Sequence, residues 1–364
     1  MTARSKLHDL IELAQEPSSE RRRELLREVT DMFFVGADAN QPKQMALFDE
    51  VMTQLTGEME AEVRAELAHR MADAAQAPRG LIRALAQDEI AVAEPILARS
   101  IVLTDSDLIL VARTKDQGHL NALSRRAHVP EAVSEVIVER ADDNTLDVLL
   151  RNEGAVLSRA AHEAAVDRAS ANPELHEAVV HRQALPPDLL NEMYFVVEAK
   201  LRDRIMQRNA ELDPAEVNAA LAAGRKNVAA RHGALPPDFA EAEKTVKAIL
   251  AKGGISPTAL AAFLRNGETT KFLVALAELA DIDYHTARRI LDRGELDALA
   301  IVCKAANFDR ALFLTFAVLV LGPEVDAMGR AKEYGKLYSD LSRDVATRTL
   351  RFWRMRRSSG DLAA

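Results

Sequence analysis

Residues 129–158 read VPEAVSEVIVERADDNTLDVLLRNEGAVLS, and they contain a pattern that recurs along the chain. Pro130 suits the first turn of a helix, where a missing N–H costs no hydrogen bond, and Ser158 suits the cap of another helix. Between them, apolar residues such as Val133 and Ile137 recur at the spacing of one helix face. The stretch therefore predicts short amphipathic helices joined by turns.

Two markers in this stretch repeat at a nearly constant interval. An aliphatic or small residue followed by a helix-starting residue occurs at intervals of 26, 26, 28 and 28, at Ala77-Pro78, Leu103-Thr104, Val129-Pro130, Leu157-Ser158 and Leu185-Pro186. An acidic or amide residue that opens the other helix recurs at intervals of 28, 27 and 29, at Asp88, Asp116, Asp143 and Asn172. Recurrence at a fixed period is typical of repeat proteins, in which helix pairs too short to bury both faces stack on one another in a right-handed superhelix.

The composition favours helices throughout. Of 364 residues, 48% are hydrophobic and 28% charged, which is enough to bury a core, whereas 15 glycines and 13 prolines supply little turn chemistry for many strands. We therefore predict an all-α fold, a HEAT-like α-solenoid of short two-helix repeats of about 26–29 residues, with helical caps.

The pattern divides the chain into five predicted segments. The pentapeptide of residues 184–188 returns unchanged at 234–238, and Ile255, Ile282 and Phe308 follow one another at intervals of 27 and 26. The predicted segments are an N-terminal helical cap (1–58), a first repeat array (59–208), an irregular helical joint (209–254), a second repeat array (255–322) and a C-terminal helix with a basic tail (323–364).

Charge and cysteine content restrict the partners and the compartment. The net charge of −9 makes the surface as a whole repel phosphate backbones, so a nucleic-acid site would have to be a local basic patch. The single cysteine, Cys303, excludes a disulfide within the chain and a site of several thiolates. The most apolar stretch, residues 311–322, is too short to cross a bilayer, and residues 1–10 are polar. We expect a cytoplasmic protein with no transmembrane segment.

A ladder of cations and amides stands at the predicted ends of the first helices. Its members are Arg99, Arg125, Arg126, Arg151, Asn152, Arg182, Arg265, Asn266 and Arg293. One interpretation is structural, because arginine at a helix C-terminus complements the dipole and bonds free carbonyls. The other is a track that binds a partner's backbone or acidic side chains. The sequence leaves both open.

The last two dozen residues are basic within an acidic protein. Residues 341–364 hold six arginines against two aspartates, a local charge of 6 − 2 = +4. The candidates for contact with an anionic partner are Arg348, Arg351, Trp353, Arg354, Arg356 and Arg357. RNA, an anionic membrane or an acidic patch on a partner or on the chain itself are all compatible with this pattern, and Trp353 also suits a buried helix face.

Catalytic patterns are absent from the sequence. Glu66 and His69 form an isolated Glu-x-x-His, and Cys303 lies in an apolar helix that predicts an inert buried thiol. We predict no enzyme, no cofactor and no metal. Self-association through the solenoid ends stays open, with aromatic candidates at Phe33-Phe34, Phe308, Phe313 and Phe316.

The chain resembles an uncharacterised bacterial family of unknown function. The resemblance rests on residues 23–33 and 63–68, on Ala77-Pro78, Asp88-Glu89-Ile90 and Pro95-Ile96-Leu97, and on Leu150-Arg151-Asn152 and residues 301–306. It spans roughly residues 20–320 and implies a cytoplasmic bacterial protein, with no catalytic residues to transfer.

Two functions follow as hypotheses. The first is a non-enzymatic scaffold or adaptor, with a possible regulatory role, whose concave solenoid face binds another protein. The second is a HEAT-like nucleic-acid-binding protein that uses local basic patches, which the net charge of −9 disfavours.

Overall fold

The computed structural model describes residues 19–36, 42–224, 235–292, 296–321 and 327–360, and within these ranges the chain forms helices and no extended strand. The all-α class predicted from composition is confirmed. The chain divides into two compact units, residues 1–184 and 185–364, and each is described by itself. The division after Ala184 falls inside the predicted first array, 59–208, and the five predicted segment boundaries stay predictions.

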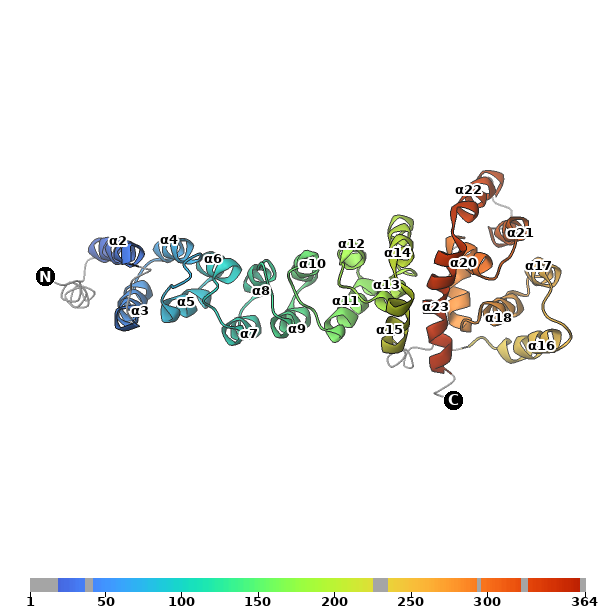
Figure 1. Cartoon of the computed structure of the whole chain (residues 1–364), viewed down its shortest axis with the longest axis horizontal. Helices are drawn as coiled ribbons and strands as arrows, with labels where there is room; N and C mark the ends of the chain where they lie inside the picture. Colours follow the sequence, from blue (N-terminus) through green and yellow to red (C-terminus); the bar gives the residue numbers. More distant parts are fainter. Residues whose placement is uncertain (1–18, 37–41, 225–234, 293–295, 322–326, 361–364) are drawn as a thin grey trace. The chain divides into compact units, whose positions relative to one another are not determined.

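In the first unit, helices of 18 and 16 residues are followed by helices of 6 to 13 residues (Figure 1). They are α2 (Ser19–Gly36), α3 (Pro42–Gly57), α4 (Ala61–Met71), α5 (Arg79–Ala86), α6 (Ile90–Arg99), α7 (Asp105–Thr114), α8 (Gln117–Ser124), α9 (Glu131–Arg140), α10 (Asp143–Arg151), α11 (Arg159–Ala171), the 3₁₀ turn η1 (Pro173–Leu175) and α12 (His176–His181).

The predicted helix starts coincide with observed ones. Helices α5, α7, α9 and α11 begin directly after Pro78, Thr104, Pro130 and Ser158. Thr104 and Asp107 form a reciprocal capping box, which satisfies free amides at the start of α7. At the other marker, Asp116 caps α8 and α10 begins at Asp143, whereas the residue before α6 is Glu89 rather than Asp88.

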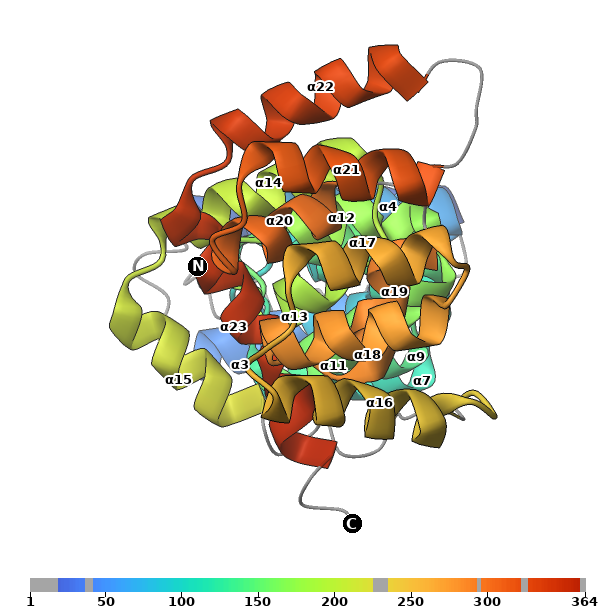
Figure 2. The same ribbon diagram turned by 90° about the vertical axis from the view of Figure 1, so that its right-hand side faces the viewer.

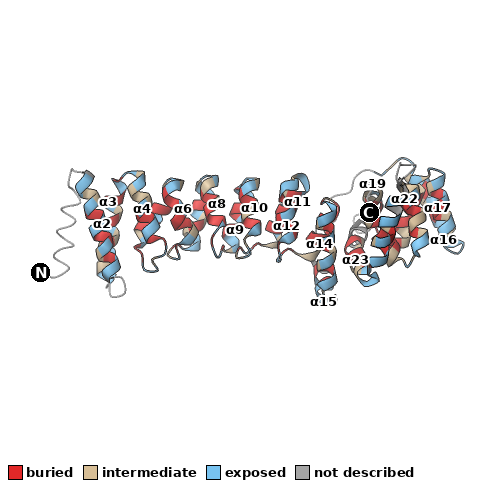
Figure 3. Cartoon of the chain, turned by 90° about the horizontal axis from the view of Figure 1, so that it is seen from above, coloured by how far each residue is buried: buried red, intermediate tan, exposed pale blue. Residues whose placement is uncertain are grey.

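Helices of the first unit pack on the second helix along the chain rather than only on the next one. α4 contacts α6, α6 contacts α8, α8 contacts α10 and α10 contacts α12, while α3 contacts α5, α7 contacts α9 and α9 contacts α11. The result is two rows of helices, visible in Figure 1. Figure 3 shows the buried residues on the sides where the helices face one another. Burial against both neighbours stabilises helices that are too short to be stable alone.

The helices of the second unit range from 7 to 18 residues. They are α13 (Pro187–Met193), α14 (Ala199–Glu211), α15 (Pro214–Gly224), α16 (Phe239–Ala251), α17 (Pro257–Arg265), α18 (Thr269–Ala280), α19 (Tyr284–Asp292), α20 (Asp297–Ala305), α21 (Arg310–Leu321), α22 (Ala327–Asp340) and α23 (Arg343–Gly360). Figure 2 shows α16, α18, α17, α21 and α22 in successive layers, each in contact with the next.

The last helix lies in the interior of the second unit. α23 packs on α13, α14, α15 and α20. The Trp353 ring lies 5.2 Å from the Tyr194 ring and 4.9 Å from the Phe195 ring, measured between centroids. An aromatic cluster of this kind contributes more than its buried area alone. The C-terminal helix is therefore core to this unit.

Three helices of the second unit end in the same way. α17, α18 and α20 are followed by Gly267, Asp281 and Asn307 in the left-handed conformation, with φ of 72°, 57° and 61°. The amides of Glu268, Ile282 and Phe308 then bond back to carbonyls of these helices at 2.8 to 3.0 Å. The residue after the cap is apolar behind α18 and α20, at Ile282 and Phe308, as is common for this kind of helix end, whereas it is Glu268 behind α17.

Candidate interaction surface

Three members of the predicted ladder cap the helix of the preceding repeat. Arg126 follows α8 and donates to the carbonyls of Leu97 and Ser100 at the end of α6, the latter at 2.8 Å. Asn152 follows α10 and donates to the carbonyls of Ser124 and Arg126 at the end of α8, at 2.8 and 2.7 Å. The structural interpretation of the ladder holds at these positions, because the side chains satisfy carbonyls that a helix end leaves free.

Arg182 repeats this contact one step further along. It follows α12 and donates to the carbonyls of Leu150, Asn152 and Ala155 at the end of α10. Burial lowers the pKa of Arg182 and of Arg126 from its ordinary value. Both guanidiniums stay charged, because arginine's ordinary pKa is far above neutrality. These side chains link the ends of α6, α8, α10 and α12.

A second ladder, which the sequence analysis missed, joins the second helices. Lys115, after α7, donates to the carbonyl of Gln87, and Arg140, at the end of α9, donates to the carbonyls of Ala112 and Lys115. Arg168, near the end of α11, donates to the carbonyl of Ala141 at 2.8 Å. A cation at the end of each second helix, at the repeat interval, was the signal that would have predicted this ladder.

The remaining cations of the first unit's ladder are exposed. Arg99 pairs with Asp73 at 3.1 Å, and Arg125 pairs with Glu94 at 3.5 Å. Arg151 pairs with Asp147 at 2.8 Å and with Glu177 at 3.5 Å. Exposed pairs of this kind contribute about 0 to 1 kcal/mol, so their arginines can exchange partners at little cost.

Two adjoining grooves open at the edge where first helices turn into second helices. The larger one, about 600 Å³, is lined among others by Arg99, Leu103, Arg125 and Arg126. The other, about 500 Å³, includes Asp49 and Pro78 in its lining. Ile101 lines both and is 74% exposed, so the two meet at this residue, and we call them together the Ile101 groove.

At the next step along the unit the two corresponding loops are paired. Val129 donates its amide to the carbonyl of Gly154 at 3.1 Å and accepts from the amide of Val156 at 2.9 Å, which makes a parallel bridge between Val129 and Ala155. The marker interval is 28 residues at this step and 26 at both steps that hold the groove. The longer loop supplies the residues that form the bridge.

The predicted ladder also has members in the second unit. Arg265 and Asn266 are exposed at and after the end of α17. Arg293 lies outside the described residues. A partner-binding role at these three positions stays a prediction.

The predicted basic tail is engaged within its own unit. Arg348 donates to the carbonyls of Ala210 and Leu212, each at 2.8 Å, beyond the end of α14. Arg351 donates to the Asn218 side chain, and Arg354 donates to the Ala280 carbonyl at 2.8 Å. Trp353 is 2% exposed. These four residues therefore contact their own unit, and their contact with an anionic partner stays a prediction. The side chains of Arg356 and Arg357 lie outside the described residues.

A buried polar cluster occupies the second unit. The side-chain amides of Asn191 and Asn209 form two hydrogen bonds with each other, both of 3.0 Å, and Asn209 also donates to Thr349 at 2.8 Å. The Tyr194 hydroxyl donates to Asp297 at 3.1 Å, and burial raises the pKa of Tyr194 well above its ordinary value. No local pattern predicts this cluster, because its partners are up to 140 positions apart.

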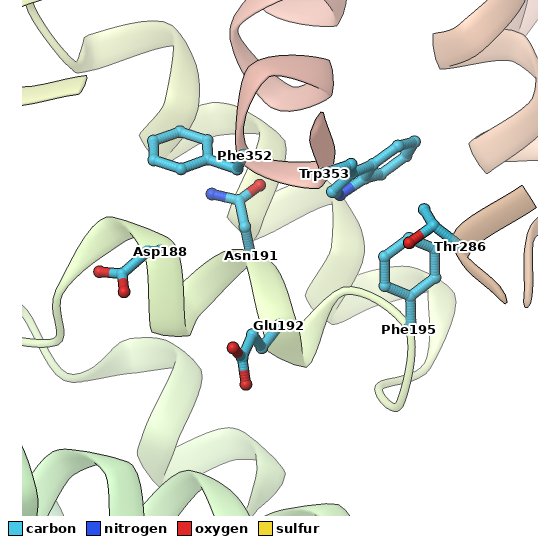
Figure 4. A pocket seen from close by; sticks show the side chains of 7 residues that line it. All are labelled: Asp188, Asn191, Glu192, Phe195, Thr286, Phe352 and Trp353. Atoms are coloured by element: carbon cyan, nitrogen blue, oxygen red, sulfur yellow. The ribbon is translucent and has the colours of Figure 1, made fainter. Parts of the chain in front are cut away.

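The cavity beside this cluster is too small for a substrate. Figure 4 shows its lining, which comes from α13, α19, α23 and the segment after α13. Its volume of about 10 Å³ has room for about one water molecule. In the described part of the second unit, the Trp353 indole nitrogen has no hydrogen-bond partner, which suits one ordered water better than a ligand.

The remaining candidates are placed as follows. Cys303 is fully buried, and burial raises the pKa of its thiol. Phe33, Phe313 and Phe316 are buried, whereas Phe34 is 40% exposed. Among the residues the structure describes, no three histidine, cysteine or acidic side chains converge as a metal site would require. Nor do these residues include a helix with the length and apolar character needed to span a bilayer.

The first unit thus belongs to the class of all-helical proteins, with helices packed in two rows and side chains that cap the ends of neighbouring helices. The comparison with protein families then places the chain. A family model described as "uncharacterised protein conserved in bacteria (DUF2336)" matches residues 92–351, and the chain belongs to this family. No curated protein and no solved structure matches the chain.

Proposed function

We propose that the first unit is a HEAT-like α-solenoid and that the protein is a non-enzymatic scaffold or adaptor that binds another protein. The observation that carries the proposal is the Ile101 groove. It combines volume, an exposed aliphatic side chain and arginines at one edge of the stack. Exposed apolar groups rimmed by polar ones are typical of protein interaction sites.

The ladders support this proposal because two of their arginines, Arg99 and Arg125, are not used to join neighbouring helix ends. Arg126, Asn152 and Arg182 are used between repeats, so they keep the stack rigid rather than contact a partner. Arg99 and Arg125 stand at the groove with only exposed acidic partners. We therefore assign partner contact to the turn edge of the solenoid rather than to its concave face.

The polar cluster of the second unit supports a structural role over a catalytic one. Its two asparagine amides are hydrogen-bonded to each other and its tyrosine to Asp297, and the adjacent cavity holds about one water molecule. Pockets that bind small-molecule substrates usually have volumes of about 300 Å³ or more, far larger than this cavity. A scaffold is the function that this arrangement fits.

Capture of partners by tagged full-length protein tests the proposal. The protein is expressed in its own bacterium and mildly crosslinked, and proteins and nucleic acids in the eluate are identified. Ile101→Asp places a charge in the groove, so we expect it to reduce the main protein partner at least about tenfold. Leu110→Asp is the matched control, since Leu110 is 47% exposed and lies outside both grooves.

The same experiment can overturn the proposal. Equal loss of the partner in both variants, with unchanged melting temperatures, would remove the groove from the interaction. Nucleic acid released by moderate salt, without a protein partner, would favour the nucleic-acid-binding alternative, because phosphate contacts weaken as salt rises.

A further inference from the structure

Two loops of the first unit already pair with each other as short extended segments. The loop after α10 lies beside the loop after α8, and Val129 forms both hydrogen bonds of the parallel bridge with Gly154 and Val156. One step earlier, in the described part of the unit, the loops after α6 and α8 have no such bridge. The larger part of the Ile101 groove lies between them.

Main-chain groups at this open step are available for pairing. Within the described residues, the amides of Ile101 and Leu103 have no hydrogen-bond partner. Loop amides of this kind are satisfied by water or by a ligand. An extended peptide laid along the loop after α6 would satisfy them as Gly154 satisfies the amide of Val129 one step later.

The charge of the groove selects the kind of peptide. Three arginines line the larger part, Arg99, Arg125 and Arg126, against one aspartate, Asp105. Arg99 and Arg125 already pair with Asp73 and Glu94, which lie outside this lining, so carboxylates of a bound peptide would take the place of these two exposed partners. Arginine presents a fork of donors that matches a carboxylate, and the weak pairs of Arg99 and Arg125 leave both forks open to exchange.

We propose that the Ile101 groove binds an extended acidic segment of a partner protein by main-chain pairing. This inference rests on the proposed scaffold function and names its partner class. Alternate residues of an extended peptide point to opposite sides. One set contacts Ile101, Leu103 and Pro130, and acidic residues of the other set meet Arg99 and Arg125.

Fluorescence anisotropy with defined peptides tests this inference on the full-length protein. The probes are a fluorescein-labelled octapeptide of alternating Asp and Val, its Lys and Val counterpart, and the acidic peptide with alternate amides N-methylated. We expect the acidic peptide to bind, the basic peptide not to bind, and N-methylation to weaken binding at least about tenfold, since it removes the pairing donors.

Two charge reversals supply the matched variants. Arg125→Glu inverts a charge in the groove, and we expect at least a tenfold loss of acidic-peptide binding. Arg113→Glu inverts an exposed charge on α7 outside the groove, and we expect binding within twofold of wild type. Equal binding of the acidic peptide by wild type and Arg125→Glu, or preference for the basic peptide, would overturn the proposal.

A photocrosslinker at position 101 distinguishes a failure of this proposal from a failure of the scaffold function on which it rests. In cells, we expect the crosslinked residue of the partner to lie in an extended segment with Asp or Glu nearby. A crosslink to a helical or basic segment of a partner would overturn the acidic extended class and leave the scaffold function standing. A crosslink to a second copy of this chain would replace the partner by self-association, and no protein crosslink at all would remove both proposals.

Discussion

Arg182 and His162 form a buried pair that shows how one residue sets the protonation of another. The Arg182 Nε donates to His162 Nε2 at 3.3 Å, and the other ring nitrogen of His162 faces the Ser158 carbonyl at 3.1 Å. Burial, aided by the charge of Arg182, lowers the pKa of His162 to about 4. The neutral imidazole accepts the hydrogen bond from Arg182, which a protonated ring cannot do.

This pair predicts a loss of stability in mild acid. The folded pKa of about 4 lies below the ordinary 6.5, so the unfolded chain takes up the proton first as pH falls. Neutral His162 therefore adds about 3 kcal/mol to the free energy of unfolding. This contribution is complete above pH 6.5, shrinks as pH falls and is lost near pH 4. Urea unfolding at several pH values measures it, with His162→Gln as the comparison, because glutamine can accept the bond without titrating.

The comparison isolates His162 from the carboxylates, which titrate in both proteins. We expect the free energy of unfolding of wild type to fall more steeply between pH 6.5 and 4.5 than that of the variant. Parallel curves for the two proteins would contradict the assignment.

The loop pairing at Val129 depends on a single glycine. A Cβ at Gly154 would lie 2.0 Å from the Ala127 carbonyl oxygen, which is main chain and has little freedom to move. Gly154→Ala must therefore separate the two loops and break the bridge between Val129 and Ala155. We expect it to lower the free energy of unfolding by about 3 kcal/mol, measured by urea titration.

Gly57 supplies the control for this substitution. It ends α3, and a Cβ there would meet nothing within 4 Å. We expect Gly57→Ala to change stability by less than about 1 kcal/mol. An equal effect of both substitutions would show that the cost at Gly154 is conformational and not a clash.

At the level of elements, the sequence predicted helix starts better than helix partners. The starts are local, because Thr104 and Ser158 each cap an amide only three residues away, and this chemistry is visible in the sequence. The role of Arg126 was not visible, because the choice between capping a neighbour and facing a groove depends on where α6 lies relative to α8. The same holds for the unforeseen ladder of Lys115, Arg140 and Arg168.

The inter-repeat caps predict how a disturbance spreads through the first unit. Arg126→Met leaves the carbonyls of Leu97 and Ser100 without their charged donor. Bonds to charged groups contribute about 1.5 to 3 kcal/mol, so we expect amide exchange in α6 to accelerate about ten- to a hundredfold. Repeats contact mainly their neighbours, so α20 and α23 of the second unit should keep their exchange rates.

Hydrogen–deuterium exchange with mass spectrometry measures this effect along the whole chain. Arg113→Met is the matched control, since Arg113 is exposed on α7 and its replacement should leave α6 unchanged. Unaltered exchange in α6 of the Arg126 variant would contradict the capping role.

At the scale of the whole molecule, the repeat interval, the all-helical class and the family resemblance were readable from the sequence, because they depend on local spacing and composition. The position of α23 was not. Its arginines and Trp353 suggested a contact with an anionic partner, yet Arg348 caps α14 and Trp353 packs on Tyr194. Residues more than 130 positions apart meet there, and nothing in the local pattern of either segment specifies the other.

The candidate surface was likewise predictable only in part. Periodicity placed arginines at the ends of the first helices, because every repeat needs a donor for the carbonyls its helices leave free. Which of them face inward, as Arg182 does, and which stay at the surface, as Arg125 does, follows from packing between repeats. The groove at Ile101 likewise exists because the neighbouring loops at that step do not pair, a property of two segments together that neither loop carries alone.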